Sequence, residues 1–246
     1  MSSTFDYEKT VELVRNALVE AGSTFREDKK NAYERAIKHE KDEKARWVLE
    51  TILENAEAAE RNHSPLCDDT GIPHLVLEVG PDVFVTGRML DAIRGGIASG
   101  LRELPGRPMG IMGDDNRRID QSGGLDPDPA GVEPAPILLR TCRENVVRLH
   151  IMMFGGGPAI RAKTYRVFHK HNTRVVIDEI VKWATEGVAQ LGCSPCTLAV
   201  GIGRSHFEAA SMMLQAQADG CYDVQSEMEE EITRRVNGSD IGPLGL

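Results

Sequence analysis

A short loop, Ser64 to Pro73, carries a thiol and two carboxylates within three residues: Cys67, Asp68 and Asp69. Proline and glycine bracket these side chains, which favours an ordered turn over a helix. A thiolate can bind a metal, and a neighbouring carboxylate can move a proton. By itself the loop is better explained as a surface turn with a buried cysteine than as a reactive site. Other segments of the chain favour the reactive site.

A run of three glycines, Gly155 to Gly157, follows an apolar stretch that ends at Phe154. Glycines after a strand let backbone N–H groups approach an anion or a cofactor closely, although such a run is more often only a turn. Arg161 and Lys163 follow and could receive carboxylates, with surface solvation as the default reading. No phosphate-loop lysine motif or G-x-G-x-x-G follows, which argues against a nucleotide site.

A C-x-x-C pair, Cys193 and Cys196, is typical of zinc sites, redox pairs or clusters. The chain has no second C-x-x-C, which argues against a four-cysteine zinc ribbon. A thioredoxin-like motif follows a strand and opens a helix, whereas this one follows a predicted helix and opens a predicted strand over 197–202.

Composition excludes several classes of protein. The 246 residues carry a formal net charge of −9, so the chain lacks the basic balance of a generic nucleic-acid binder. No apolar run approaches the length of a membrane span, and residues 1–12 lack the apolar region of a signal peptide. Five cysteines, an odd number, argue against a disulfide framework. We therefore expect a cytoplasmic protein with no nucleic-acid or membrane partner.

The chemistry-bearing segments must be positioned by predicted helices and strands. Apolar residues at helical spacing predict helices over 7–21, 29–61, 88–101, 177–191, 207–214 and 224–236. Apolar residues on both faces predict a buried strand over 74–79, with 83–85 pairing back to it. A hairpin is predicted from strands 137–141 and 146–154. The irregular stretch 104–136 is either a substrate-facing loop or a floppy insertion.

Three motifs together resemble a known family in order and spacing. They are the C-D-D-T-G loop at Cys67, the G-G-G turn at Gly155 and the G-C-x-P-x-x-x-A-V-G-I-G segment at Gly192. The chain resembles, from about Lys30 onward, the iron–sulfur hydro-lyases of the class I fumarate hydratase and L-tartrate dehydratase group. More narrowly, it is similar to their cluster-binding alpha subunit or N-terminal domain.

The resemblance implies a mixed α/β fold, with helices packed on small mixed or antiparallel sheets. It implies one domain over residues 1–246, with a helical part at 1–62 and a cluster-binding part at 63–246. It also implies a [4Fe–4S] cluster that three cysteines hold, leaving one iron open as a Lewis acid. Cys67 and Cys193 match two ligand positions, and Asp69 matches an aspartate that is a candidate proton carrier.

The third ligand position of the family is not matched. Ile151 and Pro158 stand where relatives have a cysteine, and Cys142, Cys196 and Cys221 are the remaining candidates. Cys142 ranks first, because it lies on the turn of the predicted hairpin that leads to the glycines.

The resemblance also implies the groups around a substrate. Arg107, Arg161 and Lys163 are candidate carboxylate contacts, and Gly156 shapes the backbone beside the cluster. Asp68 replaces a glutamine that helps to hold a substrate carboxylate, and an anion there would repel an anionic substrate. Fumarate itself is therefore in doubt as the substrate, and we expect a small hydroxy-dicarboxylic or related acid.

The second part of the family, a beta subunit or C-terminal domain, normally supplies the catalytic base and is absent from this chain. The chain also stops at a G-P-x-G-L segment, beyond which alpha subunits usually continue. We therefore expect a hetero- or homo-oligomer, and a chain that is nearly inactive alone. Two alternatives remain: a non-catalytic metal- or redox-sensing protein on the same scaffold, and an anion-binding module that uses the glycine turns without metal.

Overall fold

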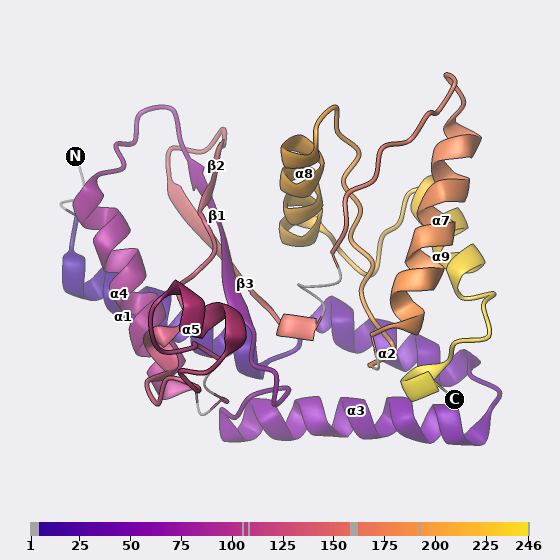
Figure 1. Cartoon of the computed structure of the whole chain (residues 1–246), viewed down its shortest axis with the longest axis horizontal. Coiled ribbons are helices and arrows are strands. Elements are labelled where there is room, and N and C mark those ends of the chain that lie inside the picture. Colours follow the sequence, from indigo (N-terminus) through magenta and orange to yellow (C-terminus); the bar gives the residue numbers. More distant parts are fainter. Residues whose placement is uncertain (1–4, 105, 108, 158–161, 192, 246) are drawn as a thin grey trace. The chain divides into compact units, whose positions relative to one another are not determined.

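The structure is a computed structural model that describes residues 5–104, 106–107, 109–157, 162–191 and 193–245 (Figure 1). The chain divides into two compact units. Unit 1 comprises Met1–Thr24 and Ala56–Gly156, and unit 2 comprises Phe25–Asn55 and Gly157–Leu246. Helices and a small sheet together make a mixed α/β fold, as predicted. The prediction of one domain over 1–246 stays a prediction.

Unit 1 is organised around a three-stranded sheet in the order β2-β1-β3. The central strand β1 (Ile72–Val79) pairs in parallel with β2 (Leu138–Thr141) and antiparallel with β3 (Val147–Phe154) (Figure 1). Strands β2 and β3 were expected to form a hairpin, and that prediction was wrong. They pair with opposite edges of β1 instead, so the turn between them spans the width of a strand.

One face of this sheet is covered by two helices that pack against each other, α1 (Tyr7–Ser23) and α4 (Gly87–Glu103). Each helix begins at a side-chain cap: Asp6 accepts from the N–H of Lys9, and Thr86 accepts from the N–H of Met89. The apolar residues whose spacing predicted both helices form the stripe that the helices bury. The fully or almost fully buried members of this core include Leu18, Leu75, Leu77, Ile97 and Leu104.

The charged segment at 29–61 is two helices, not the single helix that was predicted. They are α2 (Glu27–His39) and α3 (Glu43–Asn62), and the division between the units falls inside α3. Asp42 explains the new start, because its Oδ1 accepts hydrogen bonds of 2.9 Å from the N–H groups of Lys44 and Ala45. A capping carboxylate thus interrupts a sequence with no glycine or proline.

The irregular stretch 104–136 contains a short helix, α5 (Asp115–Asp120), and a 3₁₀ turn, η1 (Pro129–Gly131). Ile111 and Leu125 form an isolated antiparallel bridge across it. The described part of this stretch is therefore ordered, which argues against a floppy insertion. That this loop faces a substrate stays a prediction. The predicted return strand at 83–85 is not formed, and these residues lead directly into α4.

Unit 2 contains α2 together with α7 (Thr173–Ala189), α8 (His206–Asp219), α9 (Glu227–Val236) and a 3₁₀ turn, η2 (Pro243–Gly245). Its small core joins Ile177 and Ile180 of α7 to Ile232 of α9. The predicted strand at 197–202 was wrong, since these residues have no ladder partner within the described part of the chain. They lie against α8 instead: a Cβ on Gly201 would come within 1.9 Å of the carbonyl oxygen of Ala209.

Candidate functional site

The loop that carries Cys67 is attached to the core of unit 1 at both ends. At its start, the N–H of Leu66 donates a hydrogen bond of 2.9 Å to the carbonyl of Gly22, at the end of α1. Within the loop, the N–H of Thr70 donates to the carbonyl of Asp68 at 3.0 Å. The Cys67 thiol is free and exposed. A reactive side chain is therefore presented to solvent by a loop whose ends are fixed.

The loop ends at a position that only glycine can occupy without strain. Gly71 has a φ of +100°, and a Cβ there would lie 2.6 Å from the carbonyl carbon and oxygen of Phe154. Its N–H donates to the sulfur of Met109 at 3.2 Å. The backbone of the loop is thus pressed against the end of β3, directly before the glycine run.

This close approach brings two of the predicted site residues together. The Oδ1 atom of Asp69 accepts a hydrogen bond of 3.0 Å from the backbone N–H of Gly156. The glycine turn therefore uses a backbone donor to hold a carboxylate of the Cys67 loop. A general acid or base must lie within hydrogen-bond reach of the proton that it transfers, so a fixed position is the first requirement for that role.

A second pair of predicted residues also meets here. The Oδ2 atom of Asp68 lies 3.2 Å from Nη1 of Arg107, and their side chains are 80% and 50% exposed. We expected the negative charge of Asp68 to repel an anionic substrate. The structure gives it a cationic partner, so the repulsion of an anionic substrate at this point is reduced.

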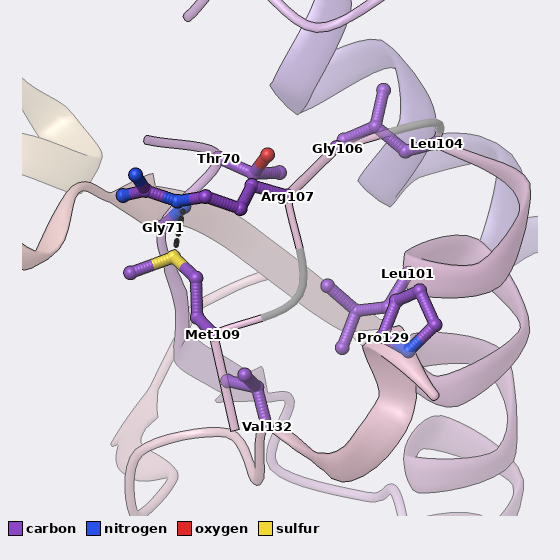
Figure 2. Close-up of a pocket in the computed structure, with 9 residues that line it drawn as sticks. All are labelled: Thr70, Gly71, Leu101, Leu104, Gly106, Arg107, Met109, Pro129 and Val132. Carbon is purple, nitrogen blue, oxygen red and sulfur yellow. Dashed lines mark hydrogen bonds between the residues drawn. The ribbon is translucent and has the colours of Figure 1, made fainter. Parts of the chain in front are cut away.

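Figure 2 shows a small cavity beside these residues, with the Met109 sulfur turned toward Gly71 and the Arg107 side chain passing close to Thr70. Its volume is about 10 Å³. A cavity of this size holds at most one water molecule, not an organic acid. Within the described part of the chain, Thr70 Oγ1 is buried there without a hydrogen-bond partner.

Sequence reasoning missed Met109, and a single Met beside prolines gives no signal that could have found it.

Cys142 lies away from this loop. It directly follows β2, and its N–H donates to the carbonyl of Val79 at 3.1 Å, at the end of β1 opposite Cys67. Seven steps along β1 at about 3.3 Å per residue give a separation of about 23 Å between the two ends of that strand. This geometry argues against Cys142 as a ligand of the same cluster as Cys67. Cys142 was ranked by its place on the turn that leads to the glycines, but the whole of β3 separates that turn from Gly155.

A cluster of paired charges also lies at that far end of the sheet. Glu78 is buried on β1, and its carboxylate pairs with Arg140 on β2 and Arg148 on β3, each at 2.5 Å. The hydrogen bond from Arg148 and the pairing with Arg140 outweigh burial and lower the pKa of Glu78 to about 2. This ionic cluster joins the three strands, and we assign it to stability.

The remaining predicted site residues lie in unit 2 or outside the residues that the structure describes. Cys193 is exposed just beyond the end of α7, and Cys196 and Cys221 are free and exposed as well. Lys163 is exposed in a segment without regular secondary structure. Arg161 lies outside the described residues. Within each unit, the described side chains contain no group of three or more His, Cys, Asp or Glu suited to hold a metal ion.

Comparisons with known proteins show the family to which this chain belongs. A sequence profile of the fumarate hydratase (Fumerase) family matches residues 11–246. The chain therefore belongs to the fumarate hydratase family, a family of hydro-lyases, as the three motifs predicted. Among the described residues, no helix has the length and apolar character needed to cross a membrane.

Two relatives share low identity over nearly the whole chain. One is the "Putative L(+)-tartrate dehydratase subunit alpha" of Methanocaldococcus jannaschii, 27% identical over 96% of this chain and 82% of that protein. The other is the "Putative fumarate hydratase class I" of Geobacillus stearothermophilus, 25% identical over 97% of this chain. The chain spans 48% of the length of the second relative, so it is similar to about half of that protein.

Proposed function

We propose that this chain is the cluster-binding, alpha-type subunit of an iron–sulfur hydro-lyase that acts with a beta subunit. The reaction is the addition or removal of water on a small (hydroxy)dicarboxylic or related acid. The observation that carries the proposal is the hydrogen bond between Asp69 and Gly156, which joins a carboxylate of the Cys67 loop to the glycine turn. The names of the two relatives agree with this reaction class.

The thiols of this chain fit a [4Fe–4S] cluster by their chemistry. Cys67 and Cys193 are free and exposed on loops, and thiolates are the usual ligands of iron–sulfur clusters. When bound, a cluster with one open iron supplies a Lewis acid for the departing hydroxide. Cys196 and Cys221 belong to the same unit as Cys193 and remain candidates for the third ligand. The position of Cys142 leaves it out of the proposed set.

The chain's own residues then have separate roles. Asp69 accepts or delivers a proton while the Gly156 N–H fixes one of its oxygens. Arg107 binds a substrate carboxylate, and Asp68 adjusts how much of its charge is available through their ion pair. Arg161 and Lys163 are further proposed carboxylate contacts. Gly156 contributes a backbone donor in a place where a side chain would meet Met109 at 3.2 Å.

A beta subunit is part of the proposal because one relative is named as a subunit alpha. The partner would supply the remaining acid–base group and carboxylate contacts, so this chain alone would turn over little or no substrate. Cytoplasmic location is also proposed, and it is supported by five free cysteines, which are typical of reducing compartments.

The test is anaerobic reconstitution of the chain with iron and sulfide, followed by titration with L-tartrate and with fumarate. We expect the visible or paramagnetic spectrum of the cluster to change on adding an acid, with hydration or dehydration only after a beta subunit is added. Succinate at high ionic strength serves as a control for general anion effects. A cluster that ignores every acid tested, or zinc in its place, would support a non-catalytic sensor instead.

A further inference from the structure

The loop that carries Cys193 is fastened to a distant segment through its neighbour, Ser194. The Ser194 hydroxyl donates a hydrogen bond of 2.6 Å to the carbonyl of Gly242. The carbonyl of Ser194 accepts a hydrogen bond of 3.1 Å from the N–H of Leu244. Both the side chain and the main chain of one residue are thus held by residues 242–244 of the same unit.

The conformation of Leu244 indicates that its surroundings hold this segment in place. Its φ is +53° and its ψ is 24°, a left-handed conformation that a bulky residue rarely adopts. Its side chain is 56% exposed, so burial of apolar surface contributes little to holding it there. An unfavourable backbone conformation persists only where the surroundings impose it. The hydrogen bond from the Leu244 N–H to the Ser194 carbonyl is one contact that holds it there.

Two hydrogen bonds on one residue restrict the residue before it. Cys193 lies beyond the end of α7 and takes part in no regular secondary structure. Fixing both the hydroxyl and the carbonyl of Ser194 fixes the orientation of its Cα, and so the position of its backbone nitrogen. Because Cys193 is bonded to that nitrogen, the positions open to the Cys193 Cα and its thiol are restricted. Metal affinity depends on ligands that are positioned before the metal binds.

We propose that Ser194 is a positioning residue, and that it and residues 242–244 form a clasp that orients the Cys193 thiol for binding iron. This inference rests on the proposed function, in which Cys193 is a ligand. Ser194 itself does not touch the metal. The clasp acts before loading, by reducing the number of conformations of an otherwise exposed loop.

The test uses two measurements on the full chain. Hydrogen exchange of metal-free protein reports the clasp in peptides covering 193–197 and 242–245. The rate of iron release to a chelator from anaerobically reconstituted protein reports its effect on the ligand. In Ser194→Ala we expect both rates to rise about fivefold, the factor that corresponds to the loss of a hydrogen bond worth about 1 kcal/mol. Ser194→Thr keeps a hydroxyl and should restore both rates.

Matched variants separate positioning from general stability. Ser239→Ala removes a hydroxyl that donates at 2.7 Å to the carbonyl of Val236, outside the clasp, and should change neither rate. Ser194→Val resembles Ser194→Thr in shape but lacks the hydroxyl, and it should behave like Ser194→Ala. Exchange that stays at the wild-type rate in both clasp variants would overturn the inference. Faster exchange with unchanged iron release would overturn it too, because the thiol would then need no clasp. If the wild type holds no iron while its exchange shows an intact clasp, the proposed function fails instead.

Discussion

Asp69 and Gly156 are joined by a hydrogen bond of 3.0 Å between Oδ1 and the backbone N–H, although 87 positions separate them in the sequence. This bond connects the Cys67 loop with the glycine turn, so it unites two of the three motifs that define the family. It also orients the carboxylate that we propose as a proton carrier. The bond needs an acceptor oxygen at position 69 but no negative charge.

Replacing Asp69 by Asn therefore separates positioning from proton transfer. The amide oxygen still accepts from Gly156, so we expect the fold and the iron content to stay as in the wild type. Loss of a general acid or base typically lowers turnover by about 100-fold or more. The measurement is steady-state kinetics of the assembled enzyme, with Asp91→Asn on the exposed side of α4 as the control. Turnover within about threefold of the wild type would remove Asp69 from the mechanism.

The ion pair between Asp68 and Arg107 predicts an effect on substrate binding. Both side chains are largely exposed, so the pair adds little stability, within about 1 kcal/mol. Asp68→Asn frees the guanidinium and should lower KM for a dicarboxylic acid several-fold, while Arg107→Ala should raise it. Arg102→Ala, which breaks the comparable exposed pair with Asp128, is the control. A higher KM in Asp68→Asn would mean that Asp68 itself binds the substrate.

Gly71 gives a prediction about the shape of the loop. Its φ of +100° and the 2.6 Å approach to Phe154 mean that Gly71→Ala strains the backbone twice. We expect a loss of about 1–3 kcal/mol in the free energy of unfolding. Gly87→Ala is the matched control, because no atom lies within 4 Å of its added Cβ and it begins α4. Equal stabilities of the two variants in urea titrations would contradict this account of the loop.

Glu78 predicts a pH dependence of stability. Its folded pKa is about 2, below its ordinary value of 4.5, because Arg148 and Arg140 donate hydrogen bonds to the charged form. A lowered folded pKa stabilises the fold above the unfolded value, and that stabilisation is lost as the pH falls from about 4.5 toward 2. Thermal melts of wild type and Glu78→Gln should therefore differ most near neutral pH and converge in acid. A gap of constant size would show that the charge of Glu78 is not what matters.

The helices of the core could be predicted from the sequence because their signals are local. α1, α4 and α7 bury the apolar stripes that predicted them, and their ends lie close to the predicted ones. The break at Asp42 was missed because a capping carboxylate looks like any other acidic residue in a charged segment. Capping is a weak signal when the flanking residues are all helix formers.

Strand pairing could not be predicted, because it is decided by partners far away in the sequence. β2 and β3 were found correctly as strands, but β1 lies between them. Cys142 was ranked first although the whole of β3 separates its turn from the glycines. In the site, the motifs identified Asp69, Asp68, Arg107 and Gly156, and the structure supplied their contacts. Met109 was missed because its role depends only on where the irregular stretch folds back.

The central claim is that Cys67 and Cys193 bind one iron–sulfur cluster, and anaerobic iron and sulfide analysis of single Cys→Ser variants tests it most directly. The wild type should hold about four irons and four sulfides per chain, as a [4Fe–4S] cluster requires. Cys67→Ser and Cys193→Ser should each lose most of both, whereas Cys142→Ser, altered at the far end of the sheet, should retain them. Full iron and sulfide in either of the first two variants would contradict the account.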